Sequence, residues 1–160
     1  MIILGIDPGI GRTGYAFLQK TGSKIALLES GCITTMPGES EAKRLLEIKK
    51  DLDLLIKKWQ PDRLCLERLF FTTNAKTAMS VSQARGIVLF SGAEHKLKII
   101  ELTPLQVKIS ATGYGKADKG QVQRMVAKLL NLKKIPKPDD AADAAAIAWA
   151  GVGRTLDQSQ

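Results

Sequence analysis

The sequence has few of the residues on which several classes of enzyme depend. It contains a single histidine, His95, and two cysteines, Cys32 and Cys65, which lack the short spacing of a zinc or redox motif. No serine or cysteine triad can be assembled, and His95 lies in a Glu-His-Lys stretch at the end of an expected helix, where we predict a solvated turn residue. Both cysteines fall in expected strands and are predicted to be reduced core residues. For a hydrolase, metal-assisted chemistry is the remaining route.

Long apolar runs are also missing. The apolar run at the start, Met1–Ile6, covers six residues and meets Asp7, so we expect no signal peptide. No run approaches the ~20 apolar residues that span a membrane. With 44% hydrophobic residues in 160, the chain can bury one core. We therefore expect a cytoplasmic protein with a single domain over residues 1–152 and a short tail over residues 153–160.

Acidic residues are scarce in one stretch of the chain. The net charge is +8, and the 30 residues from Lys108 to Lys137 contain eight basic residues and one acid, Asp118. That segment alone carries a charge of +7. Runs of charge usually form a solvated face, but this concentration favours a footprint for a polyanion such as nucleic acid.

Hydrophobic periodicity and turn residues predict an α/β protein. The expected strands are Met1–Asp7, Tyr15–Gln19, Lys24–Thr35, Arg63–Glu67 and Leu97–Leu102. The expected helices are Glu39–Trp59, Ala75–Glu94, Pro104–Ala111, a segment capped by Asp118 that runs to Leu130, and Asp139–Ala150. A hairpin followed by alternating strands and helices indicates a mixed five-stranded sheet with helices on its faces.

Four acids stand where a buried carboxylate needs a partner. Asp7 and Glu67 end two apolar strands, and ligands of such sheets lie beyond the carboxyl ends of the parallel strands. Asp140 and Asp143 are spaced i, i+3 on an alanine-rich helix, so both point from one side of it. If the four converge, they form an oxygen-ligand site for Mg²⁺.

Simpler interpretations exist for each acid. Asp7 could cap the turn Asp-Pro-Gly, Glu67 could be a surface charge at a strand end, and Asp139 is interpreted as an ordinary first-turn or capping acid. A strand, an acid, a glycine-rich turn and a hairpin also begin two superfamilies, the ribonuclease-H-like nucleases and the actin-like ATPases and sugar kinases. The latter need two related domains, for which 160 residues leave no room.

Taken together, the motifs resemble the RuvC family of Holliday-junction resolvases over nearly the whole chain. The resemblance rests on Gly5-Ile-Asp-Pro-Gly9 with Thr13-Gly14, Leu66-Glu-Arg-Leu-Phe70, Asn74, Gln83-Ala-Arg-Gly86, Gln106-Val-Lys108, Lys119-Gly-Gln-Val-Gln123 and Asp140-Ala-Ala-Asp-Ala144. It implies a ribonuclease-H-like fold, a homodimer, and paired Mg²⁺-dependent nicks in four-way DNA junctions during homologous recombination and DNA repair. It also implies RuvA and RuvB, the branch-migration proteins, as partners.

The resemblance assigns roles to individual residues. The metal ligands would be Asp7, Glu67, Asp140 and Asp143. Together with Lys119, these four acids would also be the catalytic residues. Phe70 would engage bases near the crossover, and the adjacent Phe71 leaves open which ring stacks. The residues expected to bind DNA are Phe70, Phe71, Asn74, Lys76, Arg85, Lys108, Lys116, Lys119 and Arg124.

The expected chemistry is phosphodiester hydrolysis with two metal ions per subunit. Metal ions about 4 Å apart can clamp a scissile phosphate, and Lys119 or Lys108 could offset the charge that develops on it. Ligand type alone does not distinguish Mg²⁺ from Mn²⁺. Two alternatives stay open, namely a ribonuclease-H-like nuclease acting on RNA hybrids and a junction-binding module without catalysis.

The expected homodimer has one candidate surface. In the helix Ala75–Glu94, small residues and Met79 recur along one side and would permit close packing of two helices. The helix could instead pack on the sheet, or it could do both with different faces. Symmetric cutting of a four-way junction suits a two-fold dimer.

Overall fold

The fold is built on a five-stranded mixed sheet. The computed structural model describes residues 1–68 and 75–153, and the side chains of these residues except 75–77. The sheet has the strand order β3-β2-β1-β4-β5. Its strands are β1 (Ile2–Asp7), β2 (Arg12–Thr21), β3 (Lys24–Thr34), β4 (Arg63–Glu67) and β5 (Lys98–Leu102). The first three strands are antiparallel, whereas β1, β4 and β5 run parallel to one another.

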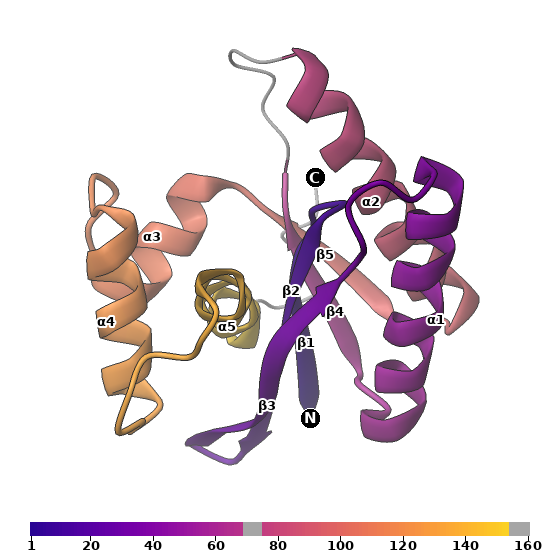
Figure 1. Ribbon diagram of the computed structural model, residues 1–160. Helices are drawn as coiled ribbons and strands as arrows, with labels where there is room; N and C mark the ends of the chain where they lie inside the picture. Colours follow the sequence, from indigo (N-terminus) through magenta and orange to yellow (C-terminus); the bar gives the residue numbers. More distant parts are fainter. Residues whose placement is uncertain (69–74, 154–160) are drawn as a thin grey trace.

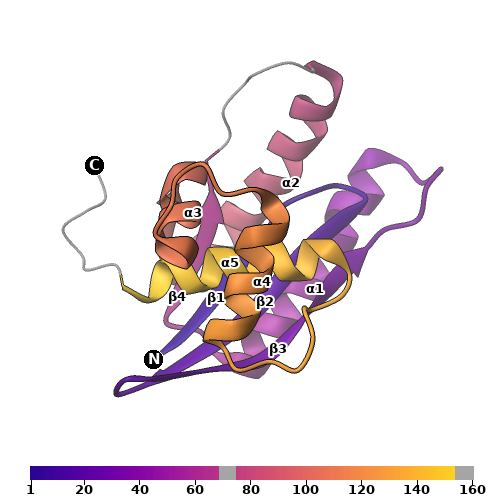
Figure 2. The same ribbon diagram turned by 90° about the vertical axis from the view of Figure 1, so that its left-hand side faces the viewer.

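Helices cover both faces of this sheet (Figure 1). The helices are α1 (Glu41–Trp59), α2 (Ala75–Glu94), α3 (Pro104–Thr112), α4 (Lys119–Leu129) and α5 (Asp139–Val152). Helices α1 and α2 lie on one face, and α3, α4 and α5 lie on the other, where Figure 2 shows them in front of the strands. The predicted mixed five-stranded sheet with flanking helices is confirmed.

The apolar strands supply a core to each face, because successive side chains point to opposite sides. Ile3 and Cys65 belong to the cluster under α3, α4 and α5, whereas Leu4 and Leu64 belong to the cluster under α1 and α2. These side chains have no exposed surface. The near-continuous apolar runs of β1 and β4 are thus explained by burial on both faces.

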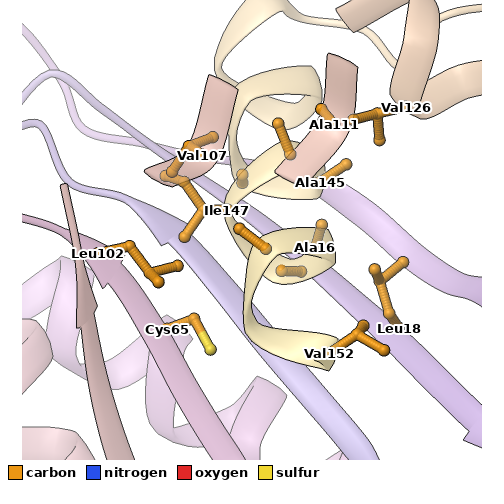
Figure 3. Close-up of a cluster of buried hydrophobic side chains, with 14 of the residues drawn as sticks. Ala16, Leu18, Cys65, Leu102, Val107, Ala111, Val126, Ala145, Ile147 and Val152 are labelled. Carbon is orange, nitrogen blue, oxygen red and sulfur yellow. The ribbon is translucent and has the colours of Figure 1, made fainter. Parts of the chain in front are cut away.

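Helix α5 lies unusually close to the sheet. A Cβ atom added at Gly5 would come closer than 3.0 Å to backbone atoms of Ala144 and Ala148. One added at Gly14 would meet the backbone of Asp140 in the same way, and one added at Gly151 would meet the Cys65 sulfur. Figure 3 shows side chains of α5, such as Ala145 and Ile147, in one buried cluster with the strand residues Ala16, Leu18 and Cys65. Glycine on both surfaces therefore fixes the distance between helix and sheet.

Side-chain caps fix the first residues of α3 and α4. Thr103 and Gln106 form a capping box at the start of α3, and Asp118 and Gln121 form another at the start of α4. The cap at Asp118 makes Lys119 the first residue of α4. The predicted start of α2 at a capping Asn74 lies outside the described residues.

The main difference from the expected elements is in β2. It begins at Arg12 rather than Tyr15, so Thr13 and Gly14 belong to the strand and Gly14 pairs with Asp7. Glycine has a low strand propensity, and the pairing with β1 together with the close approach of α5 overrides it.

None of the helices within residues 1–68 and 75–153 combines the length and apolar character needed to cross a membrane.

Candidate metal and nucleic-acid site

The two strand-borne acids lie at neighbouring positions of the sheet. Strands β1 and β4 are parallel and pair from Ile3 with Arg63 to Ile6 with Leu66. The next residues along each strand are Asp7 and Glu67, so both stand at the same edge of the sheet. This is the placement that the strand ends predict.

The two helix-borne acids reach this edge because of the glycine in β2. Gly14 pairs with Asp7 across the antiparallel ladder, and the backbone of Asp140 rests on Gly14. The first turn of α5 is therefore held above the end of β1. Asp143, one turn further along the helix, lies beside the same edge.

A cavity of about 360 Å³ opens between these elements. Asp7, Glu67 and Asp143 line it together with the cations Arg68, Lys108 and Lys119. Val107, Val122 and Ile147 supply apolar walls from three helices. The cavity thus places three acids and three cations against a partly apolar floor, where electrostatic interactions are stronger than in open water.

The pKa of Asp7 responds to the charges of the other three acids. The pKa of Asp7 is raised to about 7, first by burial and then by the negative charges of Asp143, Asp140 and Glu67. Burial likewise raises the pKa of Glu67, with a further contribution from Asp143, while Lys108 opposes the rise. Carboxylates that destabilise one another in this way favour binding of a cation.

Helix α4 contributes two groups that contact Asp143. The Lys119 ammonium lies 2.7 Å from Asp143 Oδ2 and 2.6 Å from Asp139 Oδ2. The Gln123 amide donates a hydrogen bond of 2.8 Å to Asp143 Oδ1. Asp139 is in the first turn of α5, as expected, but it makes no capping hydrogen bond and its side chain is 61% exposed. It therefore stands outside the acid cluster, as an ion-pair partner of Lys119.

Asp140 has one carboxylate oxygen without a hydrogen bond. Its Oδ2 is buried, and although Arg12 Nε lies 3.3 Å away, no hydrogen bond forms. A buried acceptor of this kind is costly unless it is satisfied. The donor set of four carboxylates, with this unsatisfied oxygen, fits a hard divalent cation such as Mg²⁺.

The residues expected to bind DNA are only partly assembled around this site. Lys108 and Lys119 line the cavity. Lys116 is exposed just before α4, and Arg124 is exposed on α4. Arg85 forms an ion pair with Glu101 of β5, so its guanidinium is already engaged. Phe70, Phe71 and Asn74 lie outside the described residues, as does the side chain of Lys76.

His95 differs from the solvated residue that the sequence predicts. Its Nε2 lies 3.1 Å from Asp53 Oδ1 on α1, and its side chain is 21% exposed. Glu94 completes a group of possible metal-binding atoms at this position. The Lys49 ammonium, however, lies 2.5 Å from Asp53 and 2.6 Å from Glu94, so a cation already neutralises the group. This cluster joins α1 to the end of α2.

Sequence reasoning missed three side chains near the acids. Arg12 sits beside Asp140, Arg68 lines the cavity, and Gln123 bonds Asp143. The signal for Gln123 was its spacing, because a residue four positions after Lys119 lies on the same side of a helix. No comparable signal marked Arg12, whose position depends on the register of β2 against β1.

A family model and similar known proteins carry the same family name. The family model described as crossover junction endodeoxyribonuclease RuvC matches residues 3–150. The protein of that name from Halothermothrix orenii is 51% identical over 92% of this chain and 90% of its own length. The one from Thermosipho melanesiensis is also 51% identical, over 93% of this chain and 95% of its own length.

Solved structures agree with the sequence matches. Thermus thermophilus RuvC in complex with a Holliday junction substrate superposes with a TM-score of 0.88 and 33% identity, covering 94% of this chain and 92% of that one. The yeast mitochondrial Holliday junction resolvase Ydc2 superposes with a TM-score of 0.68 at 18% identity, over 92% of this chain and 76% of that one, which shows a shared fold. The expected ribonuclease-H-like fold class is confirmed by these neighbours.

Proposed function

This chain belongs to the RuvC family of crossover junction endodeoxyribonucleases and is a Holliday junction resolvase, and we propose that it makes paired symmetric nicks with Mg²⁺ held by its four-acid cluster. The cluster consists of Asp7, Glu67, Asp140 and Asp143. We place the reaction in homologous recombination and DNA repair. The RuvC family is metal-dependent, whereas the choice of Mg²⁺ and two ions per subunit are part of the proposal.

The observation that carries the proposal is the cavity that joins the acids to basic side chains. Asp7 and Asp143 face the same space as Lys108 and Lys119. A phosphodiester needs both, because the acids bind the metal ions and the lysines compensate the charge of the phosphate. Exposed Lys116 and Arg124 would extend this surface along the DNA.

The protein's own groups have distinct tasks in this chemistry. Bound Mg²⁺ would activate water for in-line attack and stabilise the leaving 3′ oxygen. Asp7, at the buried end of the cluster, would hold cations in a fixed position because β1 is paired with β2 on one side and with β4 on the other. Lys119 would turn from Asp143 and Asp139 toward the phosphate, where its charge opposes the developing negative charge.

Paired nicking can be tested on a supercoiled plasmid that extrudes a four-way junction from an inverted repeat. Two coordinated nicks in opposing strands give a linear molecule, whereas one nick releases the supercoiling, removes the junction and leaves a nicked circle. We expect linear plasmid as the main product in the presence of Mg²⁺. End-labelled synthetic junctions should show the nicks at symmetric positions near the crossover.

Other outcomes would point to specific alternatives. Nicked circles alone would show that the two cuts are not coordinated. Junction binding without any cut would favour a binding module, and cutting restricted to an RNA–DNA hybrid would favour the hybrid nuclease.

Lys119→Ala is expected to slow cleavage by about 10²-fold, in the range found for removing one donor that stabilises a developing oxyanion. Binding of the junction and the mass of the assembly in light scattering should change little. Single-turnover cleavage of a labelled junction at saturating protein measures the chemical step. Lys24→Ala is the matched control, because Lys24 is exposed in the hairpin at the opposite end of the sheet. A Lys119→Ala rate equal to that of Lys24→Ala would remove Lys119 from the mechanism.

The proposal includes a two-fold homodimer. Large apolar side chains are exposed on the face that carries α1 and α2, namely Leu46, Leu54, Met79 and Phe90. Exposed apolar side chains on two adjacent helices would suit an interface if they form one patch. On the opposite side of α2, Ala84 and Val88 are fully buried against the sheet. Both packings expected for this helix can therefore hold on different sides, and RuvA and RuvB remain the proposed partners.

A further inference from the structure

Gln123 is a buried polar side chain whose amide is directed at the acid cluster. It lies in the second turn of α4 and is 9% exposed. Its Nε2 donates a 2.8 Å hydrogen bond to Asp143 Oδ1. Burying the amide of this side chain costs free energy unless the amide forms a hydrogen bond. The bond to Asp143 therefore calls for an explanation beyond packing.

The two oxygens of Asp143 have different partners. Oδ1 accepts the hydrogen bond from Gln123, and Oδ2 contacts the Lys119 ammonium. Both partners belong to α4 and are four residues apart, so one side of this helix holds the carboxylate from both oxygens. The plane of the carboxylate is thereby fixed relative to the cavity.

The two partners differ in what they can do when a cation binds. The Lys119 side chain is 57% exposed and positively charged, so a divalent cation at Asp143 would repel it. Gln123 is buried and neutral, and its hydrogen bond is compatible with a metal ion on the other oxygen. Hydrogen bonds of this kind orient carboxylate ligands and raise metal affinity.

We propose that Gln123 is a positioning residue that holds Asp143 through Oδ1, so that Oδ2 can bind the catalytic metal ion once Lys119 moves away from it. This inference rests on the proposed metal site and adds to it a residue on α4 that acts through Asp143. A bound metal ion would then displace Lys119 from Asp143, whereas the hydrogen bond from Gln123 would be kept.

The test is the Mn²⁺ affinity of Gln123→Met, measured without DNA by the electron paramagnetic resonance signal of free Mn²⁺. Methionine keeps the length of the side chain and suits a buried position, but it cannot donate the hydrogen bond. We expect Mn²⁺ binding to weaken by about 10-fold, with the melting temperature of the metal-free protein nearly unchanged. The Mg²⁺ concentration that gives half-maximal cleavage should rise by a similar factor.

Gln19→Met is the matched control, because Gln19 is exposed at the far end of β2 and should bind Mn²⁺ like the wild type. Wild-type affinity in Gln123→Met would overturn the inference. Absence of Mn²⁺ binding by the wild type would instead contradict the proposed metal site, so the two failures are distinguishable.

A second background tests whether Gln123 acts through Asp143. In Asp143→Asn, the carboxylate that Gln123 holds is gone, and the further change Gln123→Met should no longer weaken Mn²⁺ binding. A 10-fold loss that persists in this background would overturn the inference. If Gln123→Met alone unfolds, Gln123→Leu serves the same comparison, with folding checked by circular dichroism.

Discussion

Replacing Asp7 by asparagine is expected to slow junction cleavage severely and, at the same time, to make the metal-free protein more stable. Asparagine keeps the size of the side chain but removes the charge that would hold Mg²⁺, so cleavage should fall on the order of 10³-fold. Junction binding should persist, because the proposed basic contacts are unchanged. Gel-shift binding and single-turnover cleavage of the same labelled junction measure the two properties.

The stability gain follows from the raised pKa of Asp7. Burial, and then the neighbouring acids, raise this pKa from the ordinary value of 3.8 to about 7. Between these values the folded protein keeps a proton that the unfolded chain has released, so stability falls as the pH rises. The loss is complete above about pH 7 and corresponds to about 4 kcal/mol. Asp7→Asn removes it, so the free energy of unfolding should exceed that of wild type most clearly near pH 8.

Urea denaturation in the presence of a chelator, at about pH 4.5 and about pH 8, measures this difference. Asp51→Asn is the control, because Asp51 is an exposed acid of α1 away from the cavity. An Asp7→Asn protein no more stable than wild type at the higher pH would contradict the electrostatic strain in the cluster. Cleavage at the wild-type rate would separately remove Asp7 from the metal site.

Gly5→Ala is expected to destabilise the fold by about 3 kcal/mol or more, the upper range for forcing atoms into a packed core. The added methyl group would come closer than 3.0 Å to backbone atoms of both Ala144 and Ala148, and backbone cannot move aside as a side chain can. The helix α5 must therefore lift from β1. Because α5 carries Asp140 and Asp143, we also expect weaker Mn²⁺ binding in any protein that still folds.

The control is another glycine-to-alanine change in a different environment. At Gly86 of α2, an added Cβ meets nothing within 4 Å, and alanine in a helix interior is favoured over glycine by up to about 1 kcal/mol. Gly86→Ala should therefore be neutral or stabilising in urea denaturation. Equal stability of Gly5→Ala and wild type would contradict the close packing of α5 on β1.

Much of the site could be predicted from short-range patterns. The apolar runs that end at Asp7 and Glu67 identify two parallel strands, and the ends of parallel strands meet at one edge of a sheet. The i, i+3 spacing of Asp140 and Asp143 identifies one side of one helix. These inferences use only periodicity along the chain, and for that reason the sequence was sufficient.

The remainder depends on contacts that periodicity does not encode. That α5 lies on Gly5 and Gly14 follows from the register of β2 and the rotation of the helix. The engagement of Arg85 by Glu101 depends on how α2 crosses β5, and the pair His95–Asp53 depends on the contact between α1 and α2. Long side chains such as these choose among several partners, and only the packed structure selects one.

The close packing of α5 on β1 also affects how the chain folds during its synthesis. The contact joins a strand in the first residues of the chain to a helix more than 130 residues later. A nascent chain that has not yet reached α5 lacks two of the four acids and leaves Ile3 and Cys65 uncovered. Contacts between such distant segments form late and slow the folding of a domain. If the four acids hold the metal ions as proposed, nuclease activity would require the docking of α5, and chains that lack this helix would be inactive.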